Sequence, residues 1–193
     1  MKTVGITGGI GSGKSFVAEI IKAMGYPVFN SDLVAKDIMN NNADTIKFVI
    51  NNFGSSSYNN GSINKAYLAK QFFNDPEKLK IINKHVHPKV RDQFDVFCNA
   101  SNSDLIFNES AIIFETGIQN RFDAVLLILS PKKLRIKRIM DRDNVSLEDV
   151  NKRINNQLSD DQKRSLTNFH ILNDHESPLL IQIHDFIEEV SSI

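Results

Sequence analysis

The sequence contains few of the features that would tie it to an oxidising compartment, a membrane or a polyanionic partner. A single cysteine, Cys98, stands among its 193 residues, so no disulfide can form within the chain. We expect a reducing, cytoplasmic setting in which Cys98 is a small buried hydrophobe. No apolar run approaches the roughly 18 residues that a membrane helix needs, and Met1-Lys2-Thr3 leads straight into a predicted strand. We therefore expect neither a membrane span nor a leader.

An excess of charge of one sign is also lacking. The 23 Lys and Arg residues balance 23 Asp and Glu residues, which gives a formal net charge of zero. Affinity for nucleic acid comes largely from neutralisation of its phosphates, so we expect no nucleic-acid partner. The alternative is a local basic patch formed by the segment 132–142. We expect a monomer or a weak oligomer.

Two familiar kinds of motif are missing. His85 and His87 have no cysteine or carboxylate cluster at ligand spacing beside them, so a structural zinc site is not expected. The guanine motif Asn-Lys-x-Asp and the switch motif Asp-x-x-Gly are both absent, which argues against a GTPase-type switch protein.

Strand-like and helix-like segments alternate along the chain, a pattern typical of an α/β protein with a parallel sheet and helices on both faces. With 41% apolar residues the chain can bury a core, and we expect one domain over 1–193. A helical insertion is predicted over about 62–102, with Asp75-Pro76 as its cap and Pro88 breaking or restarting the helix. The polar segment 54–61 is expected to be an exposed loop. The predicted strands are 2–7, 26–29, 105–107, 124–129 and 169–172.

A Walker A pattern, G-x-x-x-x-G-K-[ST], spans Gly8 to Ser15 between the first predicted strand and a predicted helix. Its glycines let backbone N–H groups from Gly11 to Phe16 point at phosphate oxygens, helped by the positive end of the helix. Lys14 is expected to contact the β- and γ-phosphates of ATP, and Ser15 to bind Mg²⁺. The predicted ATP-binding residues of this loop are Gly8, Gly9, Ile10, Gly11, Ser12, Gly13, Lys14, Ser15 and Phe16.

Three acids follow predicted strands at the edge where parallel sheets hold ligands. Asp32 is a candidate base for an acceptor hydroxyl, with the alternative that it only caps the helix 33–39. Glu109 and Glu115 flank the apolar segment after 105–107, where a carboxylate linked to Mg²⁺ is wanted; either could instead be a solvated surface acid.

Arg135, Arg138 and Arg142 are spaced to share one face of a predicted basic helix. They are candidates to stabilise charge on a transferred phosphoryl group, as part of a helical lid over about 135–165. The alternative is an ordinary solvated helix face.

These landmarks, in their order and intervals over nearly the whole chain, resemble the dephospho-CoA kinase family. The resemblance is carried by the Walker A segment, by single polar residues and by short runs after the insertion. They are 6–15, Asp32, His87-Pro88, Arg91, 112–117, 122–125, Arg138, Arg142-Asp143, Arg153, Gln157 and Asn173.

The resemblance implies an ATP- and Mg²⁺-dependent kinase that phosphorylates the ribose 3′-hydroxyl of dephospho-CoA. It implies that Asp32 is the base, that His87 and Arg91 lie toward the acceptor, and that the helical insertion holds it. We place Glu115 among the acceptor-binding residues and Glu109 at Mg²⁺ through water. Arg138 and Arg142 would begin the lid over the phosphates, with Arg142 catalytic beside Lys14, and Asn173 would lie near the adenine.

The sequence departs from the family pattern at several positions. Phe16, Asn30, Glu109, Ala111, Arg135 and Thr167-Asn168 stand where threonine, an acid, aspartate, proline, glutamine and Ala-Asp are usual. The nearest rival function is another P-loop kinase for a nucleotide or a small alcohol, and a nucleotide-dependent switch is a rival from another class.

Overall fold

The structure, a computed structural model, describes residues 1–192, apart from the side chains at positions 73, 74 and 76. The chain forms two compact units. The sheet unit comprises residues 1–30 together with the chain from Ser101 onward, and the helical unit is Ser31–Ala100. The helical unit starts well before the insertion predicted at 62–102, because the two helices that precede residue 62 pack with the helical unit rather than with the sheet.

The sheet unit is built on five parallel strands in the order β2-β5-β1-β6-β7. β1 is central, so the glycine loop that follows it leaves the middle of the sheet at the carboxyl edge, where parallel sheets bind ligands. All five predicted strands are confirmed to within about two residues at each end. Their bounds are β1 (Lys2–Gly8), β2 (Val28–Asn30), β5 (Leu105–Glu109), β6 (Ala124–Leu129) and β7 (Phe169–Leu172).

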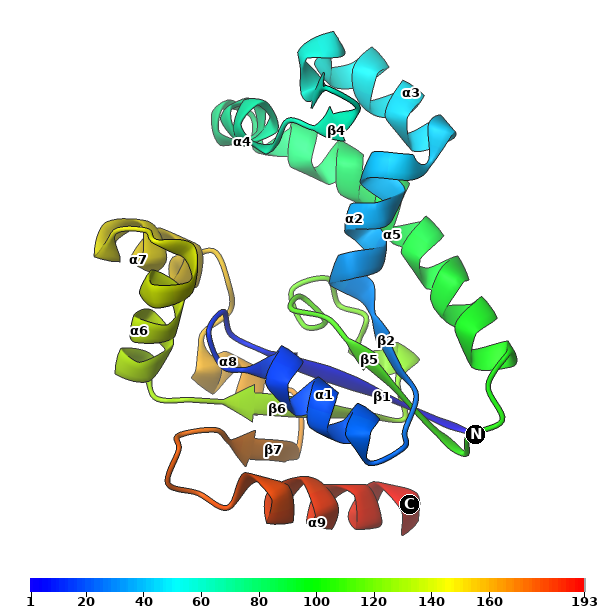
Figure 1. Cartoon of the computed structure of the whole chain (residues 1–193), viewed down its shortest axis with the longest axis vertical. Coiled ribbons are helices and arrows are strands. Elements are labelled where there is room, and N and C mark those ends of the chain that lie inside the picture. Colours follow the sequence, from blue (N-terminus) through cyan, green and yellow to red (C-terminus); the bar gives the residue numbers. More distant parts are fainter. Residues whose placement is uncertain (193) are drawn as a thin grey trace. The chain divides into compact units, whose positions relative to one another are not determined.

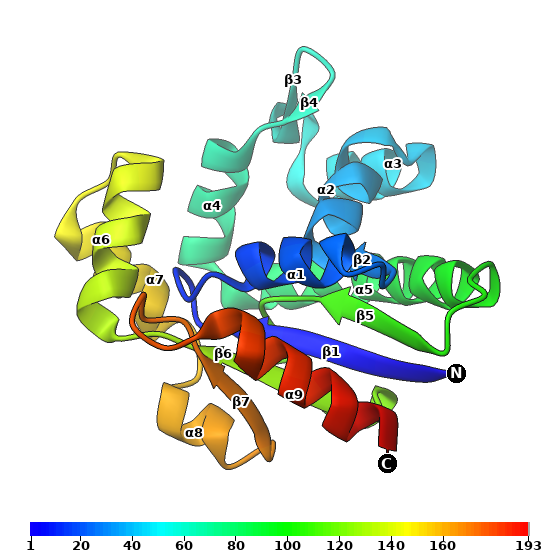
Figure 2. The same ribbon diagram turned by 60° about the horizontal axis from the view of Figure 1, so that its bottom comes forward.

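Two helices cover one face of this sheet, α1 (Lys14–Ala23) and α9 (Leu179–Ser192). They lie side by side across the strands in both ribbon views (Figures 1 and 2). Their apolar residues recur at helical spacing and meet alternate residues of the strands in the main core. Val17 and Ile21 of α1 and Ile183 of α9 are fully buried there.

The opposite face is covered differently. Ile113 and Phe114, in the irregular segment after β5, pack on Val125, Leu127 and Leu129 of β6. The rest of the sheet unit consists of η2 (Gln119–Arg121), α6 (Lys132–Asp143), α7 (Leu147–Asn155) and α8 (Asp160–Arg164).

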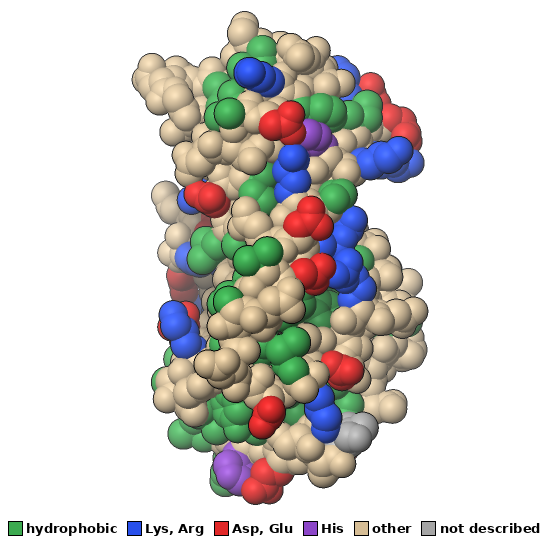
Figure 3. Space-filling view, turned by 90° about the vertical axis from the view of Figure 1, so that its right-hand side faces the viewer, with side chains coloured by type: hydrophobic (Ala, Val, Ile, Leu, Met, Phe, Trp, Pro, Cys, Tyr) green, Lys and Arg blue, Asp and Glu red, His purple; other side chains and the backbone are tan. Residues whose placement is uncertain are grey.

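The helical unit holds four helices and a small hairpin. Its elements are α2 (Ser31–Asn41), α3 (Ala43–Phe53), η1 (Ser55–Ser57), β3 (Tyr58–Asn59), β4 (Ser62–Ile63), α4 (Lys65–Asn74) and α5 (Pro76–Asn99). On the face of the molecule drawn in Figure 3, acidic and basic side chains are interspersed over the surface.

The prediction that Pro88 breaks the helix is wrong, because α5 runs unbroken through it for 24 residues. Proline removes one backbone hydrogen bond and strains the preceding turn. The neighbouring turns are nevertheless held by burial, since Val86 and Val90 are 5% and 8% exposed. The start of α5 is as predicted, with the Asp75 carboxylate accepting a hydrogen bond from the Glu77 N–H.

The segment 54–61 is not simply an exposed loop. It contains a buried Ser57 and the first strand of the β3–β4 hairpin. Asn60 and Gly61 connect the strands with φ of 49° and 76°, the backbone that a two-residue hairpin turn requires. The Asn-Gly pair is itself a hairpin signal in the sequence.

Candidate active site

The glycine loop forms an anion site at the start of α1. Gly11 and Gly13 have φ of 80° and 90°, which only glycine adopts readily. No side chain caps the helix at Gly13, so the N–H groups of its first turn stay available for phosphate oxygens. The prediction that every N–H from Gly11 to Phe16 faces phosphate needs one correction. Ser12 N–H instead donates to the Gly9 carbonyl at 3.0 Å and closes the loop on itself.

Arg138 and Asn173, both predicted to bind ATP, bond to carbonyls of this loop. Asn173 is buried, and its Nδ2 donates to the Ser12 carbonyl at 2.9 Å. A Cβ on Gly13 would lie only 2.1 Å from that nitrogen, so glycine is required there for packing as well as for φ. Arg138 Nη1 donates to the Gly11 and Ser12 carbonyls at 3.3 and 3.4 Å, and burial lowers the pKa of its guanidinium. Both side chains therefore orient the loop, and their contact with ATP stays a prediction.

A buried carboxylate stands beside the P-loop serine. Glu109, the last residue of β5, is 4% exposed. Its Oε1 accepts from Ser15 Oγ at 2.6 Å, and its Oε2 accepts from Asn30 Nδ2 at 2.5 Å. The two groups predicted to hold Mg²⁺, the Ser15 hydroxyl and the Glu109 carboxylate, are thus adjacent.

These donors fit magnesium. Mg²⁺ prefers oxygen ligands, keeps several waters, and is usually held by one or two protein groups together with substrate phosphates. The described residues contain no group of three or more His, Cys, Asp or Glu side chains that could hold an ion without such help. Lys14 lies at the same loop, and its Nζ donates to the Gly8 carbonyl at 3.1 Å.

The three arginines of the predicted stripe have three different environments. Arg135 is 5% exposed and is bonded to the P-loop and to Asp160. Arg138 donates hydrogen bonds to carbonyls of the P-loop. Arg142 is largely exposed and pairs through Nε and Nη2 with its neighbour Asp143, at 2.7 and 3.1 Å. The hydrogen bond to Asp143 raises the pKa of Arg142.

Asp143 holds two guanidinium groups at once, since Arg153 Nη1 also donates to it at 2.5 Å. These hydrogen bonds, with that from Arg142 the stronger influence, lower the pKa of Asp143 to about 2. Two arginines of the predicted lid are therefore held together at the end of α6.

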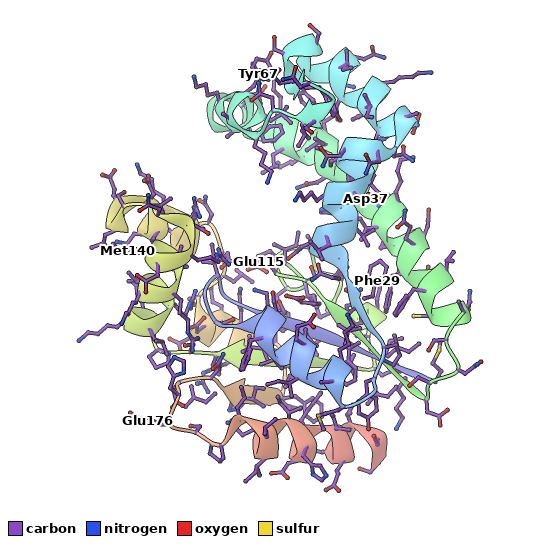
Figure 4. All side chains as sticks on the ribbon, viewed as in Figure 1. Phe29, Asp37, Tyr67, Glu115, Met140 and Glu176 are labelled. Carbon is purple, nitrogen blue, oxygen red and sulfur yellow. The ribbon has the colours of Figure 1, made fainter. Side chains whose placement is uncertain are left out.

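Glu115, predicted to contact the acceptor, has partners within the sheet unit. It comes from the segment after β5 (Figure 4), and its Oε1 lies 2.8 Å from Nζ of Lys163 and accepts from Leu158 N–H at 3.2 Å. The Lys163 side chain is fully buried, so this ion pair fixes the segment around α8. A role for Glu115 with the acceptor stays a prediction.

The other predicted acceptor residues belong to the helical unit. Asp32 lies in the first turn of α2, which begins at Ser31, so it is inside the helix rather than at the cap. His87 and Arg91 are four residues apart on α5 and so lie on one face of it. Burial, with a smaller effect of the Arg91 charge, lowers the pKa of His87. His85 is packed within the unit, its ring stacked on Phe48 with centroids 3.9 Å apart.

Three polar residues with no predicted role lie at the site. Asn30 is bonded to Glu109, Gln157 to the P-loop, and Asp160 to Arg135. Gln157 had a signal as one of the family landmarks, and Asn30 had one as a departure from the family pattern at a position where an acid is usual. No helix among residues 1–192 is long and apolar enough to cross a membrane.

A P-loop at the carboxyl edge of a parallel sheet, with a buried carboxylate on its serine and arginines on a following helix, defines the class of P-loop kinases. Comparison with known proteins gives the particular family. A model of the dephospho-CoA kinase family matches residues 2–178, and the chain belongs to this family. Its members are ATP-dependent kinases of coenzyme A biosynthesis.

Individual relatives agree along the chain. The chain is 36% identical over 185 residues to a dephospho-CoA kinase of Bacteroides fragilis, covering 95% of this chain and 90% of that one. A solved structure from Thermus thermophilus has a TM-score of 0.84 at 30% identity and covers 99% of this chain and 96% of its own. The solved dephospho-CoA kinase from Campylobacter jejuni has a TM-score of 0.68 at 28% identity, covering 98% and 97%.

Proposed function

We propose that this protein transfers the γ-phosphoryl group of ATP to the ribose 3′-hydroxyl of dephospho-CoA, giving CoA and ADP. The observation that carries the kinase chemistry is the hydrogen bond from Ser15 to the buried Glu109 beside the uncapped helix of the P-loop. The acceptor follows from the family and from the names of the relatives.

The P-loop residues would bind the phosphates of ATP. N–H groups of the first turn of α1 meet the phosphate oxygens, and Lys14 exchanges its bond to the Gly8 carbonyl for the β- and γ-phosphates. Mg²⁺, held by Ser15 with Glu109 through water, would neutralise charge on the phosphates.

Asp32 would accept the proton of the acceptor hydroxyl, with His87 and Arg91 contacting the acceptor. Phosphoryl transfer needs positioning and charge balance more than covalent help from the protein. Arg142 would therefore act as the charge partner of the transferred group after leaving Asp143. An exposed ion pair of this kind contributes only about 0–1 kcal/mol, so the exchange costs little.

The test compares acceptors under identical Mg·ATP conditions: dephospho-CoA, adenosine, AMP and shikimate, with the position of the new phosphate read by NMR. We expect phosphate on the 3′-oxygen of dephospho-CoA and little turnover of the small acceptors, because contacts to the remote parts of a substrate orient its reacting group. Equal use of a small acceptor, or phosphate on the 2′-oxygen, would falsify the choice of acceptor and leave the kinase chemistry standing. We also propose that the protein is cytoplasmic and is a monomer or a weak oligomer. Gel filtration of the purified protein tests the oligomeric state.

A further inference from the structure

Ile10, at the outer turn of the P-loop, has both of its backbone polar groups bonded to side chains from beyond β6. Its N–H donates to Oε1 of Gln157 at 2.8 Å. Its carbonyl accepts from Nε of Arg135 at 2.9 Å. The two bonds restrain the peptide groups on either side of Ile10, which lie directly before the glycines that shape the phosphate site.

Arg135 is in turn held rigidly. Its Nη1 lies 2.9 Å from each carboxylate oxygen of Asp160, and its side chain is 6% exposed. The guanidinium also packs directly on the loop, because a Cβ on Gly9 would lie 2.2 Å from Nη2 and 2.5 Å from Cζ. Gly9 is therefore needed for the close approach of Arg135.

Asp160 and Gln157 lie on a segment that is itself held in place by a buried ion pair. Lys163 is fully buried with Nζ 2.8 Å from Oε1 of Glu115, and Leu158 N–H bonds to the same oxygen. The contact of Lys163 is an ion pair rather than a hydrogen bond, since its Nζ has no hydrogen-bond partner among the described residues. Breaking a buried pair leaves an uncompensated charge, so this anchor resists displacement.

We propose that Gln157 and Arg135 are positioning residues for ATP, which act by fixing Ile10 and so the orientation of the P-loop amides. They bond to the N–H and the carbonyl of Ile10, so they act on the shape of the phosphate site through the backbone of the loop. The proposal rests on the proposed function only for the binding of ATP and not for the acceptor.

Position 135 allows a matched test, because the side chains of arginine, glutamine and methionine all reach the ε position, the fourth atom beyond Cα. Gln Nε2 falls where Arg Nε stands and can donate to the Ile10 carbonyl, whereas the terminal methyl of Met cannot. Both Arg135→Gln and Arg135→Met lose the pair with Asp160. The difference between them isolates the bond to Ile10.

The measurement is the dissociation constant of Mg·ATP by calorimetry without acceptor, together with the melting temperature and the KM for dephospho-CoA. We expect Arg135→Met to bind ATP about fivefold to tenfold more weakly than Arg135→Gln, at matched melting temperatures, because it leaves the Ile10 carbonyl without its donor. Gln157→Met should weaken the binding of Mg·ATP by a similar factor relative to the wild type. The KM for dephospho-CoA should stay within about twofold of the wild-type value in each variant.

Lys133→Met is the control for charge, since it removes one positive charge from an exposed position on the same helix as Arg135 and should leave ATP affinity unchanged. Equal ATP affinity of Arg135→Gln and Arg135→Met, or loss of ATP binding only in proportion to lost stability, would overturn the proposal. Failure of the wild-type protein to phosphorylate dephospho-CoA would instead refute the proposed acceptor, because the binding measurement does not involve it.

Discussion

Asn30 donates its side-chain amide to Oε2 of Glu109 at 2.5 Å, while Oε1 of the same carboxylate accepts from Ser15. Asn30 and Glu109 are both departures from the family pattern, in which an aspartate is usual at each of these positions. An acid at position 30 would face the buried Glu109 carboxylate with a second negative charge and without the donor. The two departures are therefore complementary.

This complementarity predicts coupling between positions 30 and 109. Asn30→Asp alone should lower kcat/KM for Mg·ATP, because two carboxylates then compete at one site. Glu109→Asp alone should lower it because the shorter side chain withdraws from Ser15 or Asn30. The double variant restores the usual pair of aspartates. Its loss in kcat/KM for Mg·ATP, expressed as a free energy, should be smaller than the sum of the losses of the two single variants. We expect a coupling energy of about 1–3 kcal/mol in this double-mutant cycle. Strictly additive losses would show that the two departures are independent.

Lys14→Ala should reduce phosphoryl transfer by at least about 10²-fold while the melting temperature changes little. Lys14 is the P-loop side chain expected to pair with the transferred phosphate, and its Nζ donates to the Gly8 carbonyl of the same loop. Lys22→Ala, at the exposed far end of α1, is the control. Near-normal turnover of Lys14→Ala would remove the assignment of the ATP site.

Asp32→Asn tests the proposed base. Asparagine keeps the size of the side chain and its place in the first turn of α2, but cannot take a proton, so kcat should fall by about 10²-fold or more with ATP affinity unchanged. Asp37→Asn on the same helix (Figure 4) is the control for loss of charge. If the two variants behave alike, Asp32 serves only the stability of the helix N-terminus.

The sequence predicted the strands and the P-loop because buried parallel strands read as short apolar runs and the Walker A spacing is set by phosphate geometry. It could not predict where arginines on one helix face point. Spacing alone placed Arg135 and Arg142 on the same helix face. In the structure Arg135 is buried against Gly9, whereas Arg142 is exposed and paired with Asp143. Which of them is buried depends on the missing Cβ of a glycine far away in the sequence, and no local pattern encodes that contact.

His87 predicts a pH dependence of stability. Its pKa is lowered in the folded protein, by burial first and by Arg91 second, so the folded state favours the neutral ring. The stability it contributes is complete above the unfolded pKa of about 6.5 and is lost as the pH falls toward the folded pKa, because the unfolded chain binds the proton first. His87→Gln should therefore flatten the decrease in the urea midpoint between pH 7.5 and 5.5. The exposed His184→Gln should leave that decrease as in the wild type.

Arg142→Ala tests the charge partner of the transferred group. In the structure Arg142 is paired with Asp143, whose pKa of about 2 keeps it ionised throughout any practical assay range. The pair is lost only as the pH falls through that value, so acidification between pH 8 and 5 should not by itself release Arg142.

Removing the side chain should lower the single-turnover rate by about 10²-fold, since a guanidinium beside the phosphoryl group acts mainly in the transition state. Stability should change by less than about 1 kcal/mol, because the pair is exposed. Lys152→Ala, which breaks the exposed pair with Glu148 on α7, is the matched control and should leave the rate unchanged. A rise confined to the KM for ATP, with an unchanged single-turnover rate, would assign Arg142 to ground-state binding of the nucleotide instead.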